Sequence, residues 1–212
     1  MKTLVKTLFV SALTAIVLSS SVYTSVAAEK APHFFAVSTE IDFNKVVITG
    51  NVNVELIQSD KQKVVIYENY NNATTSVKQR GDKLFINSKE EEPISIIVYV
   101  KDLQRIDASN TVTVRTGKFS SSVLQVFLKD KARASVSAEI GSLYTVIKDN
   151  SELKLRGTTK DHVSIKSRVA KLKTESFAAL NTTSTQVEEM TLVDNNVLSL
   201  SKDTVIAERI VR

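Results

Sequence analysis

The chain of 212 residues is 42% apolar and 24% charged, with a formal net charge of +5, a balance typical of folded rather than disordered proteins. It has no Cys, which excludes a disulfide framework, a Cys-ligated zinc or iron–sulfur site and a thiol nucleophile. Two His residues leave little material for a His-based metal cluster, and without Trp any aromatic stacking platform must be built from Tyr and Phe. The composition predicts a folded protein with no cofactor or metal.

Residues 1–28 have the pattern of a secretory signal peptide. Lys2 and Lys6 precede an apolar run over 8–18 that is too short to cross a bilayer, and small residues end the segment at Ala28. We expect a mature chain of residues 29–212 without a transmembrane segment, located in the periplasm, on the outer cell surface or outside the cell. Removing both lysines lowers the charge to +3, which argues against a nucleic-acid partner.

Short β-branched runs predict strands through the first half of the mature chain. Turn-prone residues such as Asn, Asp and Gly separate these runs, which lie at 46–49, 52–57, 63–67, 83–87 and 94–100. No window of the mature chain shows a sustained helical apolar stripe. The sequence therefore predicts an all-β fold.

From about residue 105 onward the turns become regular. Ten intervals between turn-prone clusters cover the stretch from Ser109 to Asp203, so the mean spacing is about nine. Two architectures have this spacing. One is an antiparallel β-sandwich or barrel, and the other is a two-sheet β-solenoid with about nine residues per half coil, whose coils stack in parallel.

A repeated pattern favours the solenoid. Asp130 and Asp149 each follow an apolar pair, and the interval between them matches the length of one full coil. We therefore expect strands near residues 126, 146 and 165 to be parallel neighbours. The mature chain is then one domain, with an irregular N-terminal cap over about 40–104, regular repeats over about 105–203 and a C-terminal cap over 204–212.

Few residues suggest chemistry. The candidate carboxylates are expected in corners, where Asp serves turn formation, and they are Asp107, Asp130, Asp149 and Asp194. The run from Asp149 to Glu152 lacks the ligand ladder of a calcium loop, and His162 is expected in a solvated loop. We expect no catalytic residue and no metal ligand.

The charges are distributed unevenly. Residues 148–173 hold eight Lys or Arg against three acids, a net charge of +5. If Leu153, Leu155, Ile165 and Leu172 face the core, the alternation of a strand turns the intervening basic residues outward. The expected basic stripe, suited to an anionic glycan or envelope surface, consists of Lys154, Arg156, Lys166, Lys171 and Lys173. The simpler interpretation is a solvated face.

Three segments, 43–60, 81–87 and 96–110, resemble the head GIN domain family of auto-transporter adhesins, found in exported proteins of Bacteroidetes-type bacteria. The resemblance extends over about residues 40–200. It implies a right-handed two-sheet β-helix and a role in cell adhesion, and it supplies no catalytic residues. The corners depart from the family, because Asn and Asp replace its Gly-rich turns, but both residue types tolerate the left-handed conformation.

Two main functions therefore remain open at this point. The favoured one is a non-enzymatic exported envelope protein that binds a cell surface, a glycan or an envelope partner. The alternative is a lyase or hydrolase that acts on a polysaccharide from a β-helix scaffold. A purely structural or signalling envelope domain is a third.

Overall fold

The computed structural model describes residues 34–37, 42–67, 71–188 and 207–211, all within the compact unit Phe34–Arg212. These residues form strands and turns without helix, and hydrogen bonds join the strands into one thirteen-stranded sheet. The predicted all-β class is therefore confirmed. The predicted signal peptide lies outside the described residues. Within the described ranges, no helix has the length and hydropathy needed to span a membrane.

The first eight strands are short and are β1 (Phe34–Val37), β2 (Lys45–Gly50), β3 (Val52–Gln58), β4 (Lys63–Tyr67), β5 (Thr75–Arg80), β6 (Lys83–Ser88), β7 (Ile94–Val100) and β8 (Arg105–Ala108). β2 pairs in parallel with β6 and β8, and β3 pairs in parallel with β7. Antiparallel strands flank this group, because β5 pairs with β6 and β4 pairs with both β7 and β1.

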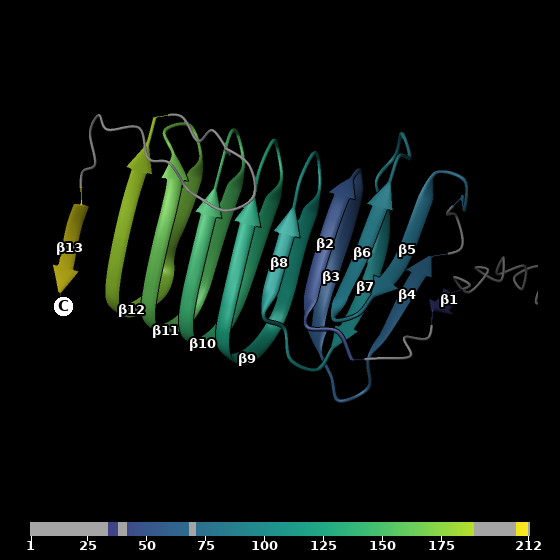
Figure 1. Ribbon diagram of the computed structural model, residues 1–212, viewed down its shortest axis with the longest axis horizontal. Coiled ribbons are helices and arrows are strands. Elements are labelled where there is room, and N and C mark those ends of the chain that lie inside the picture. The colour runs from purple at the N-terminus through teal and green to yellow at the C-terminus, as the bar shows by residue number, and fades with distance from the viewer. Residues whose placement is uncertain (1–33, 38–41, 68–70, 189–206, 212) are drawn as a thin grey trace, which may run out of the picture. The chain divides into compact units, whose positions relative to one another are not determined.

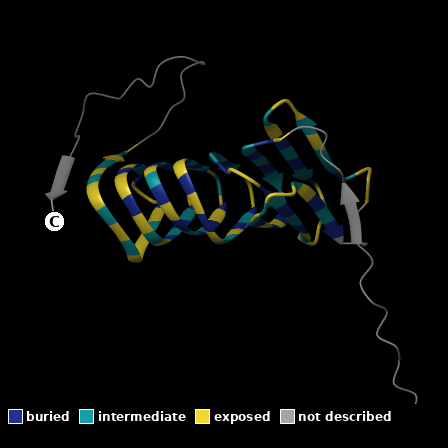
Figure 2. Ribbon diagram, turned by 90° about the horizontal axis from the view of Figure 1, so that it is seen from below, coloured by how far each residue is buried: buried dark blue, intermediate teal, exposed yellow. Residues whose placement is uncertain are grey.

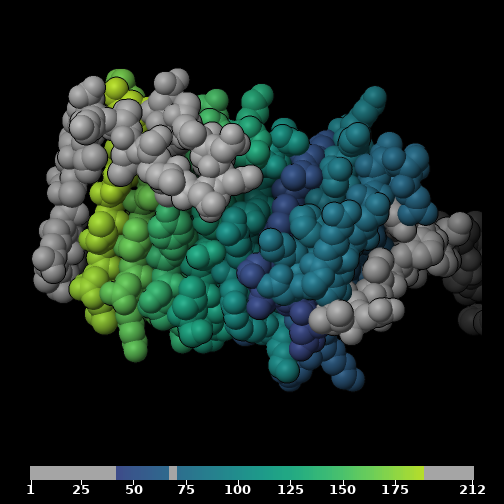
Figure 3. Space-filling model, in the orientation of Figure 1, coloured from purple at the N-terminus to yellow at the C-terminus, as the bar shows by residue number. Residues whose placement is uncertain are grey.

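Four long strands follow, namely β9 (Thr113–Leu128), β10 (Arg133–Ile147), β11 (Glu152–Ser167) and β12 (Lys171–Val187). Each pairs in parallel with the next, and register partners are 19 or 20 residues apart in sequence throughout. Val126 pairs with Thr145, and Val146 pairs with Ile165, so the expected parallel neighbours are present. Figure 1 shows each long strand curling through a bend, and the strands lie side by side in chain order in Figure 3. We call β9–β12 the stack.

The bend divides every long strand into two arms. Alternation of buried and exposed residues breaks near Ser122 and at the pair Lys160 and Asp161, where two adjacent residues are exposed. The first arms comprise residues 113–121, 133–140, 152–159 and 171–179, and the second arms comprise 123–128, 142–147, 161–167 and 181–187. The first arm of β9 pairs with β3, and its second arm pairs with β8. The two arms thus continue two separate groups of N-terminal strands.

The core consists of inward side chains aligned from strand to strand. Val114, Ala134 and Leu153 form one such column in the first arms, and Leu124 and Leu143 pair in the second arms. Figure 2 shows the buried and exposed bands alternating along the strands. Burial of this apolar surface stabilises the fold by roughly 25 cal/mol per Å². β12 has no fully buried residue, whereas β10 and β11 have many.

The turns that precede β9, β10 and β11 share one backbone conformation. Asn110, Asp130 and Asp149 all have left-handed φ angles, of 67°, 61° and 52°. The side chain of each Asp reaches the preceding turn, since Asn110 N–H donates to Asp130 Oδ2 and Asp130 N–H donates to Asp149 Oδ2, both at 2.9 Å. The prediction that Asn and Asp replace Gly in these corners is therefore confirmed.

The last described strand is β13 (Ala207–Val211), which pairs antiparallel with residues 181–185 of β12. Asp194 lies outside the described residues.

Candidate functional site

The outward side chains of the first arms are strongly basic. One register column contains Arg115, Ser135, Lys154 and Lys173, and the column beside it contains Thr113, Arg133, Glu152 and Lys171. A third column contains Lys118, Ser137, Arg156 and Ser176. We call the seven cations of these columns the basic face, and they are Arg115, Lys118, Arg133, Lys154, Arg156, Lys171 and Lys173.

Strand alternation places these side chains on the surface. The residues between them in sequence, such as Val114 and Leu153, are fully buried, so their neighbours must point the other way. Lys154 is half-buried and the other six cations are exposed. Four of the five residues of the predicted stripe therefore lie together, and the sequence analysis missed Arg115, Lys118 and Arg133. Parallel pairing at an offset of one coil is the signal that would have found them.

On the four long strands, Glu152 is the one acid in these three columns, and on β3 exposed Glu55 continues the column of Arg115. Lys173 Nζ forms an ion pair with Glu152 Oε1 at 2.5 Å. The pair lowers the pKa of Glu152 and raises the pKa of Lys173, chiefly through the hydrogen bond between the two side chains. Exposed Glu139 lies in the next outward column, and exposed Glu175 follows Lys173 in β12. The basic face thus keeps an excess of positive charge.

Lys166 does not lie on the basic face. It belongs to the second arm of β11, in a register column with Leu128 and Ile147, which are both buried. The predicted stripe is wrong at this position, because the bend shifts the alternation by one residue. His162 and Ser164 consequently point inward, whereas the predicted core residue Ile165 is only half-buried. Val163, between the two inward residues, is 40% exposed.

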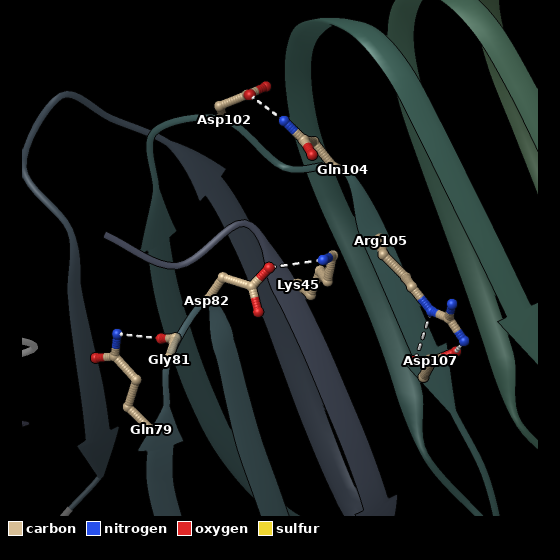
Figure 4. Close-up of polar contacts among 8 residues, drawn as sticks. All are labelled: Lys45, Gln79, Gly81, Asp82, Asp102, Gln104, Arg105 and Asp107. Carbon is tan, nitrogen blue, oxygen red and sulfur yellow. Dashed lines mark hydrogen bonds and ion pairs between the residues drawn. The ribbon is translucent and has the colours of Figure 1, made fainter. Parts of the chain in front are cut away.

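The candidate carboxylates within the described residues have structural partners. Asp130 and Asp149 serve the turns, whereas Asp107 lies inside β8 and not in the predicted corner. Its carboxylate accepts two hydrogen bonds from Arg105, at 2.8 and 3.1 Å, and Figure 4 shows this pair close to the ion pair of Lys45 and Asp82. Among the described residues, no three His, Asp or Glu side chains are placed to hold a metal ion.

His162 also differs from its prediction. It is 3% exposed, where a solvated loop was expected, because the shifted alternation of the second arm turns it into the core. It therefore has no access to a substrate on the surface.

The sequence over residues 42–187 matches the family described as putative auto-transporter adhesin, head GIN domain. The chain belongs to this family. The resemblance noted in the sequence is therefore confirmed over most of the described residues.

Solved structures share the fold at low sequence identity. A putative adhesin from Bacteroides fragilis is 19% identical with a TM-score of 0.59, and the match covers 73% of this chain and 78% of that chain. A putative adhesin from Parabacteroides merdae is 10% identical with a TM-score of 0.59, covering 75% and 79%. A putative lipid binding protein from Parabacteroides distasonis is 13% identical with a TM-score of 0.58, covering 75% and 80%. No curated protein matches the sequence.

Proposed function

We propose that this head GIN domain protein is a non-enzymatic envelope protein that binds an anionic glycan or envelope surface through the basic face. The observation that carries the proposal is the alignment of seven cations on four adjacent strands, against Glu152 on the same strands and Glu55 on the neighbouring β3. Membership of an adhesin-like family supports a binding role. The carboxylates of Asp130 and Asp149 accept hydrogen bonds from turn backbone and that of Asp107 from Arg105, and these structural roles support the absence of catalysis.

The spacing of the basic face suits an extended polyanion. Paired strands lie about 4.8 Å apart, which is less than the Debye length of about 8 Å at physiological ionic strength. The fields of cations in one column, such as Lys154 and Lys173, therefore overlap, and Glu152 offsets part of the charge of Lys173. A ligand that lies across the strands would meet positive charge on each successive strand.

The architecture that carries the basic face and the cellular location of the protein are part of the same proposal. We propose that the bent, parallel strands wind as a right-handed two-sheet β-solenoid, which the nearly constant offset between register partners supports. We also propose that residues 1–28 direct export and that the mature chain acts in the envelope or outside the cell. The charged start and the short apolar run support this.

A charge-reversal variant tests the basic face. The triple change of Lys154, Lys171 and Lys173 to Glu should reduce binding of the mature chain to polygalacturonate by more than about tenfold, because it removes the aligned positive charge. The matched control applies the same change to Lys61, Lys89 and Lys129, which are exposed turn residues away from these columns. Equal losses of binding in both variants would show that the positions of the lysines do not matter, which would contradict a binding site on the basic face.

The same protein tests the non-enzymatic part of the proposal. Incubation with a panel of acidic and neutral polysaccharides should leave their chain lengths unchanged, as measured by size-exclusion chromatography. Shortened products that disappear on Asp-to-Asn substitution would instead establish a polysaccharide-active enzyme.

A further inference from the structure

The core of the stack changes its chemistry along the second arms. In β9 the inward residues Leu124 and Val126 are apolar and fully buried. The register partners of Leu124 are Leu143 and then His162. Those of Val126 are Thr145 and then Ser164. Polar side chains thus replace apolar ones inside the C-terminal half of the stack, where no turn or hairpin requires them.

His162 is tightly enclosed among these residues. Its Nε2 atom lies 3.1 Å from Thr145 Oγ1, and its ring meets the Phe177 ring edge-on, with centroids 5.7 Å apart. Ser164, two residues along the same arm, is 1% exposed, and its Oγ atom has no hydrogen-bond partner in the part of the chain that the structure describes. The site therefore offers a hydroxyl and an aromatic edge to the imidazole ring.

Among the described residues, none of the groups packed against His162 can balance a positive charge. The residues from β10 are Leu143 and Thr145, and those from β12 are Phe177 and Thr182. The inward side chains of the first arm of β11 are uncharged as well, and they are Leu153, Leu155 and Thr159.

The charged residues in the second arm of β11 do not balance a positive charge on His162 either. Asp161 is exposed and accepts a hydrogen bond from Asn181 Nδ2 at 2.9 Å, and Lys166 carries a positive charge of its own. Burial alone lowers the pKa of His162 from 6.5 to about 4.

We propose that His162 makes the C-terminal end of the stack acid-labile, because protonation of its ring at low pH stabilises a state in which the second arms of β11 and β12 have separated from the core. The ring is neutral in the folded stack and gains a proton only when it reaches water. β12 is the element that yields, because its inward residues Phe177 and Thr182 cover His162 without being fully buried themselves.

The direction in which stability changes with pH follows from the different proton affinities of His162 in the folded and unfolded chains. The unfolded chain binds a proton at His162 near pH 6.5, and the folded chain binds it only near pH 4. Stability from this residue is therefore fully present above pH 6.5 and is lost as the pH falls toward 4. Between pH 7 and pH 5 the unfolding equilibrium constant should rise about 20-fold through this residue alone.

The experiment measures urea unfolding of the mature chain between pH 7 and pH 5. The wild-type chain should show the rise, the variant His162→Leu should show most of it removed, and His33→Leu should behave as the wild type. His33 is a matched control because the chain has only these two histidines. An identical pH dependence in His162→Leu and the wild type would overturn the proposal.

Hydrogen exchange on the wild type locates the change and does not depend on the variant folding. After correction for intrinsic exchange rates, protection at pH 5 should fall first in residues 161–187, while β2, β6 and β8 stay protected. Uniform loss over all strands would overturn local opening. So would a histidine that titrates near pH 6.5 in the folded protein by NMR, once His33 has been assigned with its variant.

Discussion

At the scale of the residue, Gly157 lies where two backbones approach closely in the stack. Its φ angle is +103°, and a Cβ atom there would lie 2.1 Å from the carbonyl oxygen of Ala138. Gly157 sits in a register column with Phe119, Ala138 and Phe177, so small residues separate two large ones. The variant Gly157→Ala should lower the free energy of unfolding by about 2 kcal/mol or more.

Gly117 is the matched control for this prediction. It lies in the first arm of β9, and a Cβ atom there would meet nothing within 4 Å. Gly117→Ala should therefore change the free energy of unfolding by less than about 0.5 kcal/mol. Urea denaturation measures both, and a similar effect in the two variants would contradict the close approach at Gly157.

Asp149 stabilises the turn that precedes β11. Asp149 has a left-handed φ angle, and its carboxylate accepts the hydrogen bond from Asp130 N–H. Asp149→Ala loses the acceptor and strains the backbone, which should cost about 1–2 kcal/mol of unfolding free energy. Asp149→Asn keeps an acceptor oxygen and tolerates the same φ angle, so it should cost less than half as much. Thermal denaturation of the two variants checks this order.

At the scale of the element, the second arm of β11 carries a polar group without a partner. Ser164 Oγ is buried and makes no hydrogen bond to any described residue, and in β9 the same column holds Val126. Ser164→Ala should raise the free energy of unfolding by about 1 kcal/mol, since it removes an unpaired buried hydroxyl. Ser142→Ala changes an exposed residue of β10 and should have little effect. Destabilisation by Ser164→Ala would indicate that the hydroxyl has a partner.

In β11, the sequence predicted the orientation of side chains correctly in the first arm and wrongly in the second. Alternation identified the first arm correctly, since Leu153 and Leu155 are buried and Lys154 and Arg156 point outward. It failed beyond the bend, because Lys160 and Asp161 are both exposed and shift the phase by one residue. The alternation of apolar and polar residues in a sequence does not show where a bend will shift that alternation by one residue. Ile165 and Lys166 were therefore assigned to the wrong sides.

At the scale of the whole molecule, regular turn spacing was enough to predict that strands one coil apart are parallel neighbours. It was not enough to show which cations meet, because that depends on the register between strands. Arg115 and Arg133 lie outside the basic segment of the sequence, yet they share columns with Lys173 and Lys171. The basic face is thus a property of the parallel register.

The most direct test of the basic face is the salt dependence of binding. The Debye length falls from about 10 Å at 0.1 M salt to about 3 Å at 1 M, so aligned surface charges are screened over this range. The affinity of the mature chain for polygalacturonate should fall by more than about tenfold between these concentrations, and neutral dextran should not bind. Binding to polygalacturonate that is unchanged by salt, or equally strong binding to dextran, would contradict recognition through the basic face.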